Sequence, residues 1–84
     1  MGFETAVEKL DKYFRRLEKG KAQKIKPSHV EKVISKLEVK TRILQAELAE
    51  TDKESKKVRL EHKLEMVREQ QSRARWLLEK IGNP

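Results

Sequence analysis

Apolar residues recur along the chain in alternating steps of three and four, the spacing that gathers side chains on one face of an α-helix. The first stripe consists of Phe3, Val7, Leu10, Phe14 and Leu17. The second consists of Val30, Ile34, Leu37, Thr41, Leu44 and Leu48. The third consists of Leu60, Leu64, Val67, Gln71, Ala74, Leu78 and Ile81. These stripes predict an all-α protein with three amphipathic helices.

Glycine and proline indicate where the helices end. Gly20 follows the first stripe, as a C-terminal glycine should, and Gly82 follows the third. Pro27 disfavours helical backbone at Lys26, so the stretch between Gly20 and Pro27 is expected to be a connection. The expected elements are helices over about residues 3–19, 29–50 and 53–81, with a basic linker at 20–27.

Two short motifs resemble helix starts. Ser28 stands three residues before Glu31, and Thr51 stands three residues before Glu54. In such a capping box the hydroxyl and the carboxylate each accept a hydrogen bond from a free amide of the first turn. We therefore expect Ser28 to begin the second helix and Thr51 to begin the third.

The second and third stripes are out of phase, which favours two helices over one long rod. Continuing the second stripe beyond Leu48 requires apolar residues at positions 51, 55, 58 and 62, but only Val58 is apolar, and the others are Thr51, Ser55 and His62. A turn near residues 50–53 then gives an antiparallel hairpin of the coiled-coil kind over residues 28–82. We expect one domain, residues 1–84, in which the N-terminal helix is an accessory element packed on this hairpin.

The hairpin geometry places specific residues at its open end. If the chain turns around residue 52, Val30 lies opposite residue 74, and residues 75–81 extend beyond the start of the second helix. Leu78 and Ile81 would then be exposed, so we expect the N-terminal helix to cover them, with a dimer partner as the other candidate.

The second helix carries a further apolar strip on the side opposite its stripe, made of Val39, Ile43 and Ala46. A helix with two apolar faces must contact two neighbours. The first helix is one candidate for this contact. A second copy of the chain is the other, because a small hairpin gains core by pairing.

The residue types give no support to catalysis. The 84 residues include no cysteine, which excludes disulfides and thiolate metal sites, and the histidines His29 and His62 lack metal-binding spacing. The three glycines are too far apart for a phosphate-binding loop, and no nucleophile motif is present. We expect no catalytic residue, no metal and no cofactor, and therefore a protein that acts by binding.

No stretch of the sequence is suited to a membrane. The longest apolar run is Trp76-Leu77-Leu78, far shorter than a membrane span. Acidic residues at Glu4 and Glu8 are not typical of a secretory signal. A cytoplasmic location is expected.

The net charge of +7 is unevenly distributed. Residues 1–29 and 53–84 each carry +4, whereas residues 30–52 carry −1. The hairpin brings the two basic segments to one end of the molecule, which we call the basic pole. Its expected members are Lys21, Lys24, Lys26, Arg73, Arg75 and Trp76.

A basic pole favours an anionic ligand. Our first expectation is an acidic protein partner, bound by an adaptor, assembly or small regulatory module. The alternative is nucleic acid, because a pI near 9.8 is typical of domains that contact phosphates. In the simplest structural interpretation the lysines only keep the connection soluble, and Trp76 packs against a neighbouring helix.

Overall fold

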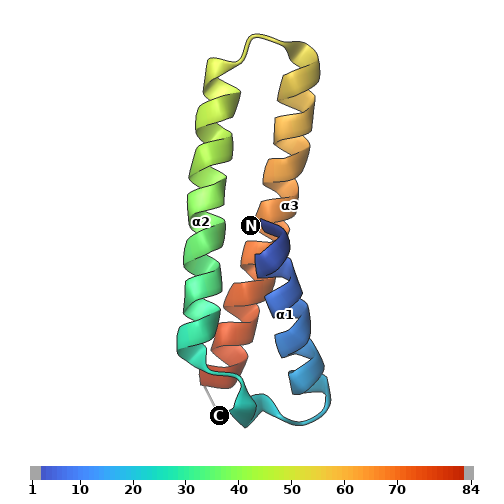
Figure 1. Ribbon diagram of the computed structural model, residues 1–84, viewed down its shortest axis with the longest axis vertical. Coiled ribbons are helices and arrows are strands. Elements are labelled where there is room, and N and C mark those ends of the chain that lie inside the picture. Colours follow the sequence, from blue (N-terminus) through green and yellow to red (C-terminus); the bar gives the residue numbers. More distant parts are fainter. Residues whose placement is uncertain (1–2, 83–84) are drawn as a thin grey trace.

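The computed structural model describes residues 3–82, which fold into three α-helices joined by short connections (Figure 1). The elements are α1 (Phe3–Glu18), the 3-10 helix η1 (Ala22–Lys24), α2 (Pro27–Glu50) and α3 (Glu54–Gly82). No strand occurs among the described residues. The all-α prediction is confirmed, and residues 51–53 form the expected turn in place of a continuous rod.

The two long helices run antiparallel, and α1 lies along the half of the hairpin farthest from its turn (Figure 1). The molecule is elongated, with extents of 48 × 20 × 18 Å. Of the described helices, none is both long and apolar enough to cross a membrane.

The C-terminus of α1 is closed by a Schellman motif. Gly20 adopts a left-handed backbone with φ of 72°, which favours glycine. The Lys21 amide donates to the carbonyl of Arg16 (2.8 Å), and the Gly20 amide donates to that of Leu17 (3.1 Å). Gly20 therefore ends α1 and turns the chain into the connection.

Both capping-box predictions are wrong. The N-cap of α2 is Lys26, which makes no side-chain capping hydrogen bond, and Pro27 is the first helical residue. Proline fixes φ near the helical value, so the helix begins at Pro27 and Ser28 falls inside its first turn. Thr51 instead ends α2, and its hydroxyl oxygen accepts a hydrogen bond from the Lys53 amide (3.4 Å).

One apolar core joins all three helices. Its fully buried side chains include Leu10 from α1, Val33 and Leu37 from α2, and Leu77 from α3. The stripes omit Leu77 and Val33, as well as Ala6 and Tyr13 of α1, all of which are buried. Because each hairpin helix contacts two neighbours, its buried face is wider than a single three-four stripe.

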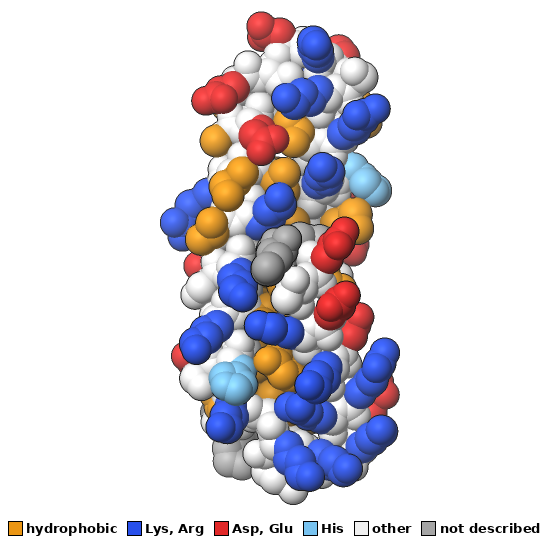
Figure 2. Space-filling view, viewed as in Figure 1, with side chains coloured by type: hydrophobic (Ala, Val, Ile, Leu, Met, Phe, Trp, Pro, Cys, Tyr) orange, Lys and Arg blue, Asp and Glu red, His pale blue; other side chains and the backbone are white. Residues whose placement is uncertain are grey.

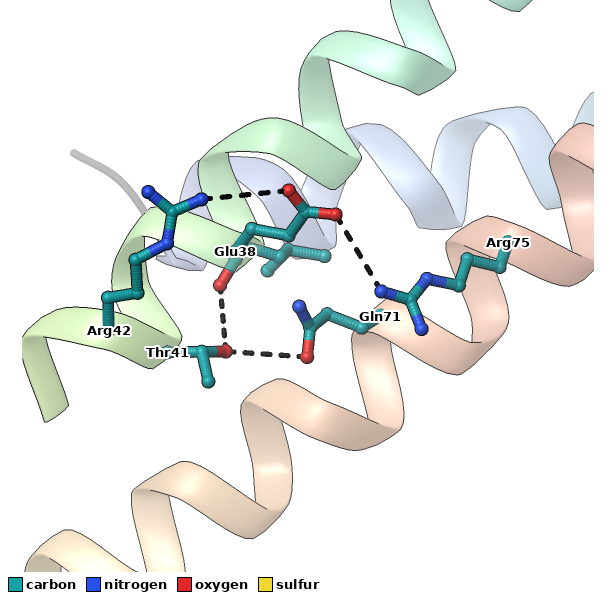
Figure 3. Close-up of polar contacts among 6 residues, drawn as sticks. Glu38, Thr41, Arg42, Gln71 and Arg75 are labelled. Atoms are coloured by element: carbon teal, nitrogen blue, oxygen red, sulfur yellow. Dashed lines mark hydrogen bonds and ion pairs between the residues drawn. The ribbon is translucent and has the colours of Figure 1, made fainter. Parts of the chain in front are cut away.

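The hairpin register differs from the expected pairing of Val30 with residue 74. Thr41 Oγ1 lies 3.3 Å from Gln71 Oε1, and Arg75 Nη2 lies 3.6 Å from Glu38 Oε1 (Figure 3). Residue 75 therefore contacts the interior of α2 and does not extend beyond its start. Part of the shift arises because helical side chains point towards the N-terminus of their own helix, so contacting residues are offset along antiparallel helices.

Candidate functional site

Positive charge is concentrated around a surface depression at the C-terminal end of α1. Six basic residues line it, and we call this set the basic surface: Lys12, Arg15, Arg16, Lys19, Lys21 and Lys24. Figure 2 shows Lys and Arg side chains gathered over the lower part of the molecule, where α1 ends and the connection to α2 begins. The depression is therefore formed by one helix and the loop that follows it.

Helical spacing and the Gly20 turn together build this surface. Lys12, Arg15, Arg16 and Lys19 follow one another in steps that place them on one face of α1. After the turn, the connection returns beside α1, where Arg16 Nη1 donates to the carbonyl oxygen of Lys24 (3.3 Å). The loop lysines are thus held next to the helix residues.

The connection is anchored as well as basic. Ile25 is buried in the core although it belongs to neither α1 nor α2. Its amide donates to the carbonyl of Ala22 (3.0 Å), and the Lys24 amide donates to that of Lys21 (3.0 Å), which closes η1. The structure therefore departs from a freely flexible linker over residues 20–27.

The positive charge of the basic surface is not neutralised by neighbouring acids. Residues 12–24 contain six basic residues and one acid, Glu18. Within residues 3–82 the ion pairs use Arg42, Arg73 and Arg75, and none uses a member of the basic surface. Arg15 and Arg16 lie in the last turn of α1, where their positive charge interacts favourably with the negative end of the helix dipole and stabilises the helix. That stabilising role does not extend to Lys21 and Lys24, which lie beyond the helix.

The structure separates the expected basic pole into two groups. Lys21 and Lys24 line the depression, but Lys26, Arg73, Arg75 and Trp76 do not. Lys26 is exposed at the N-cap of α2.

Arg73 and Arg75 connect helices. Arg73 Nη2 is 3.1 Å from Asp11 Oδ1, and its guanidinium lies over the Phe14 ring, 4.7 Å from the centroid. Arg75 pairs with Glu38, which also lies 4.0 Å from Arg42 (Figure 3). Because these ion pairs are largely exposed, each contributes at most about 1 kcal/mol to stability. Both arginines are thus occupied within the chain.

Trp76 packs against α1. Its ring stacks on Phe14 with centroids 5.8 Å apart and planes 11° from parallel, and Lys80 Nζ lies 5.5 Å from the ring centre. The side chain is still 46% exposed. This matches the structural interpretation, in which the tryptophan contacts a neighbouring helix.

The Val39–Ile43–Ala46 strip is exposed. Val39 and Ile43 retain 49% and 47% of their accessible surface, and Ala46 is also exposed. The expectation that the first helix covers this strip is therefore wrong, because α1 buries its apolar face against the shared core instead. Contact with a second copy stays a prediction.

Sequence reasoning did not assign three residues of this depression to the basic pole, namely Lys12, Arg15 and Arg16. Their signal was present in the spacing of basic residues along α1, which repeats the steps of the apolar stripe. The charge was instead assigned to the connection and to the end of the third helix, because the assumed register brought those two segments together.

No other chemistry stands out in the described residues. Over 3–82, no group of three or more His, Cys, Asp or Glu side chains could hold a metal ion. No family model matches the sequence, and no curated protein or solved structure matches it significantly.

Proposed function

We propose that this chain is a non-enzymatic helical interaction module, an adaptor, assembly or small regulatory protein, that binds an acidic segment of a protein partner. The basic surface is the binding site. The observation that carries the proposal is the gathering of six basic side chains around one depression, with no ion pair to any of them among residues 3–82. A cytoplasmic location belongs to the same proposal.

The form of the surface suits a flexible acidic peptide. It combines the end of a 16-residue helix with an anchored loop, so both elements contribute cations to the lining of one depression. A chain of Asp and Glu side chains can bend into such a hollow and pair with several cations at once. Complementary charge of this kind also accelerates association.

Nucleic acid is the alternative, and the high positive charge supports it. The aromatic side chains argue against it. One face of the Trp76 ring is stacked on Phe14, Lys80 Nζ lies 5.5 Å from the ring centre, and Tyr13 is buried, so little aromatic surface is open to stack on bases. The basic residues of α1 are also followed by basic residues in a loop. A protein that contacts bases in the major groove of DNA usually inserts an exposed helix there, which is a different arrangement.

The test is binding of a fluorescein-labelled acidic peptide, rich in Asp and Glu, measured by fluorescence anisotropy. A variant with four lysines of the basic surface changed to glutamine should bind at least about tenfold more weakly, since exposed charge pairs contribute up to about 1 kcal/mol each. The four substitutions are Lys12→Gln, Lys19→Gln, Lys21→Gln and Lys24→Gln.

The matched control removes the same charge elsewhere, through Lys32→Gln, Lys36→Gln, Arg59→Gln and Arg68→Gln. Its four positions are exposed and lie outside the depression. The control should keep the wild-type affinity within about twofold. Equal losses in both variants would show that only total charge matters, which would contradict a specific site.

A further inference from the structure

A groove between α2 and α3 continues beyond the N-terminal end of α1. Figure 1 shows that α1 begins about midway along the hairpin and follows it only towards the open end. Where α1 begins, a depression is lined by Lys40 from α2, by Lys63, Met66 and Val67 from α3, and by Glu4 from α1. We call this depression the upper groove.

The upper groove has an apolar floor between two cations. Val67 is buried at its base, whereas Met66 is 42% exposed. Lys40 is half-buried on one side, and Lys63 is exposed on the other. In the part of the chain that the structure describes, neither lysine forms an ion pair. The floor and the flanks together present an apolar stripe bordered by positive charge.

The docking of α1 shows what the lower half of the same groove accepts. α1 inserts Ala6 and Leu10 into the core between the hairpin helices. On its flank, Asp11 pairs with Arg73 of α3 at 3.1 Å. The lower half thus holds a helix with an apolar face and one acidic residue paired across to α3, and the upper half offers an apolar floor beside basic residues.

The exposed strip on α2 adjoins this groove. Ile43 lies three residues after Lys40, so the two side chains are neighbours on the helix surface, and Val39 lies one turn before Ile43. A helix seated beside Lys40 would therefore also cover part of the strip, which exposes large apolar side chains in the single chain.

We propose that the upper groove binds an amphipathic helix of a protein partner, with an apolar stripe and acidic residues on both flanks, as a continuation of α1. This helix-in-groove contact is independent of the basic surface. Glu4 closes the end of the groove next to α1, so the acidic flanks belong beside Lys40 and Lys63 and not at the end that meets α1.

The test uses two labelled synthetic peptides of about 18 residues, or five helical turns, built from the same leucines, alanines and glutamates. One peptide is ordered to give an apolar stripe with glutamate on both flanks, and the other is scrambled to remove the stripe. Fluorescence anisotropy should show that the wild-type protein binds the ordered peptide at least about tenfold more tightly. Equal binding of both would overturn the proposal.

Variants then assign the binding to the groove. The double variant Lys40→Glu/Lys63→Glu and the single variant Met66→Glu should each weaken binding of the ordered peptide by about tenfold or more. The matched control Lys32→Glu/Arg68→Glu changes the charge by the same amount at exposed positions outside the groove. It should bind the ordered peptide at least about fivefold more tightly than the double groove variant does. Circular dichroism confirms that each variant is folded. Equal losses in the two double variants would overturn the proposal.

Two further readouts distinguish other occupants and other sites. In ¹⁵N-resolved NMR spectra the ordered peptide should shift the amide signals of Lys40, Lys63 and Met66. Shifts confined to residues 12–24 would place the peptide on the basic surface and overturn the groove. If the wild type sediments as a dimer and Met66→Glu as a monomer, a second copy occupies the groove, and the proposal fails while the proposed function stands.

Discussion

Leu77→Ala is expected to lower the free energy of unfolding by about 2–5 kcal/mol. Leu77 is fully buried, and the closely packed core of so small a domain cannot readily collapse around the space that the lost side chain leaves. Urea denaturation followed by circular dichroism gives the change in unfolding free energy.

The neighbouring residue supplies the control. Leu78 lies on the predicted stripe, but the structure leaves it only partly buried. Leu78→Ala should therefore cost less than Leu77→Ala, and Val58→Ala should cost little, because Val58 is 64% exposed. A larger loss of unfolding free energy for Leu78→Ala than for Leu77→Ala would support the stripe inferred from the sequence and contradict the structure.

Leu10→Ala is expected to destabilise the whole protein by a similar amount, about 2–5 kcal/mol. Leu10 of α1 is fully buried in the same core as Leu37 and Leu77. Loss of its side chain should lower the midpoint of a single unfolding transition, seen equally by circular dichroism and by Trp76 fluorescence, because Trp76 stacks on α1.

Two separate unfolding transitions in this experiment would contradict the prediction of one cooperative unit. The hairpin would then unfold independently of α1, and the first helix would be the accessory element expected from the sequence. The burial of Ala6, Leu10 and Tyr13 favours one cooperative unit instead.

The helices themselves could be predicted from local signals. Periodicity located all three, and Gly20 ended α1 as expected because its left-handed backbone suits glycine. The phase break after Leu48 located the turn at residues 51–53. Ser28 was misleading because Pro27, one residue earlier, sets the backbone geometry that begins the helix.

The tertiary contacts could not be predicted in the same way. A three-four stripe describes a helix with one neighbour, whereas Val33 and Leu77 are buried where each hairpin helix meets two. The register depends on how side chains such as Gln71 lean along their helix, and no local pattern encodes that offset.

The assumed register also determined which residues were expected in the basic pole. The assumed pairing brought Arg73 and Arg75 to the lysines of the connection, whereas in the structure Arg73 pairs with Asp11 and Arg75 pairs with Glu38. Of the expected members of the basic pole, Lys21 and Lys24 line the depression, and their role in binding stays a prediction. What was missed is that α1 supplies the remaining cations.

The central claim is that the basic surface contacts an acidic protein segment, and site-specific photocross-linking in the cells that make this protein tests it most directly. A photoreactive amino acid replaces Lys21 in the basic surface, and in a control it replaces Lys32, which is exposed on α2 outside the depression. The account predicts adducts from position 21 only, resistant to nuclease, that map to segments of a partner rich in Asp and Glu. Nuclease-sensitive adducts, or the same adducts from both positions, would contradict it.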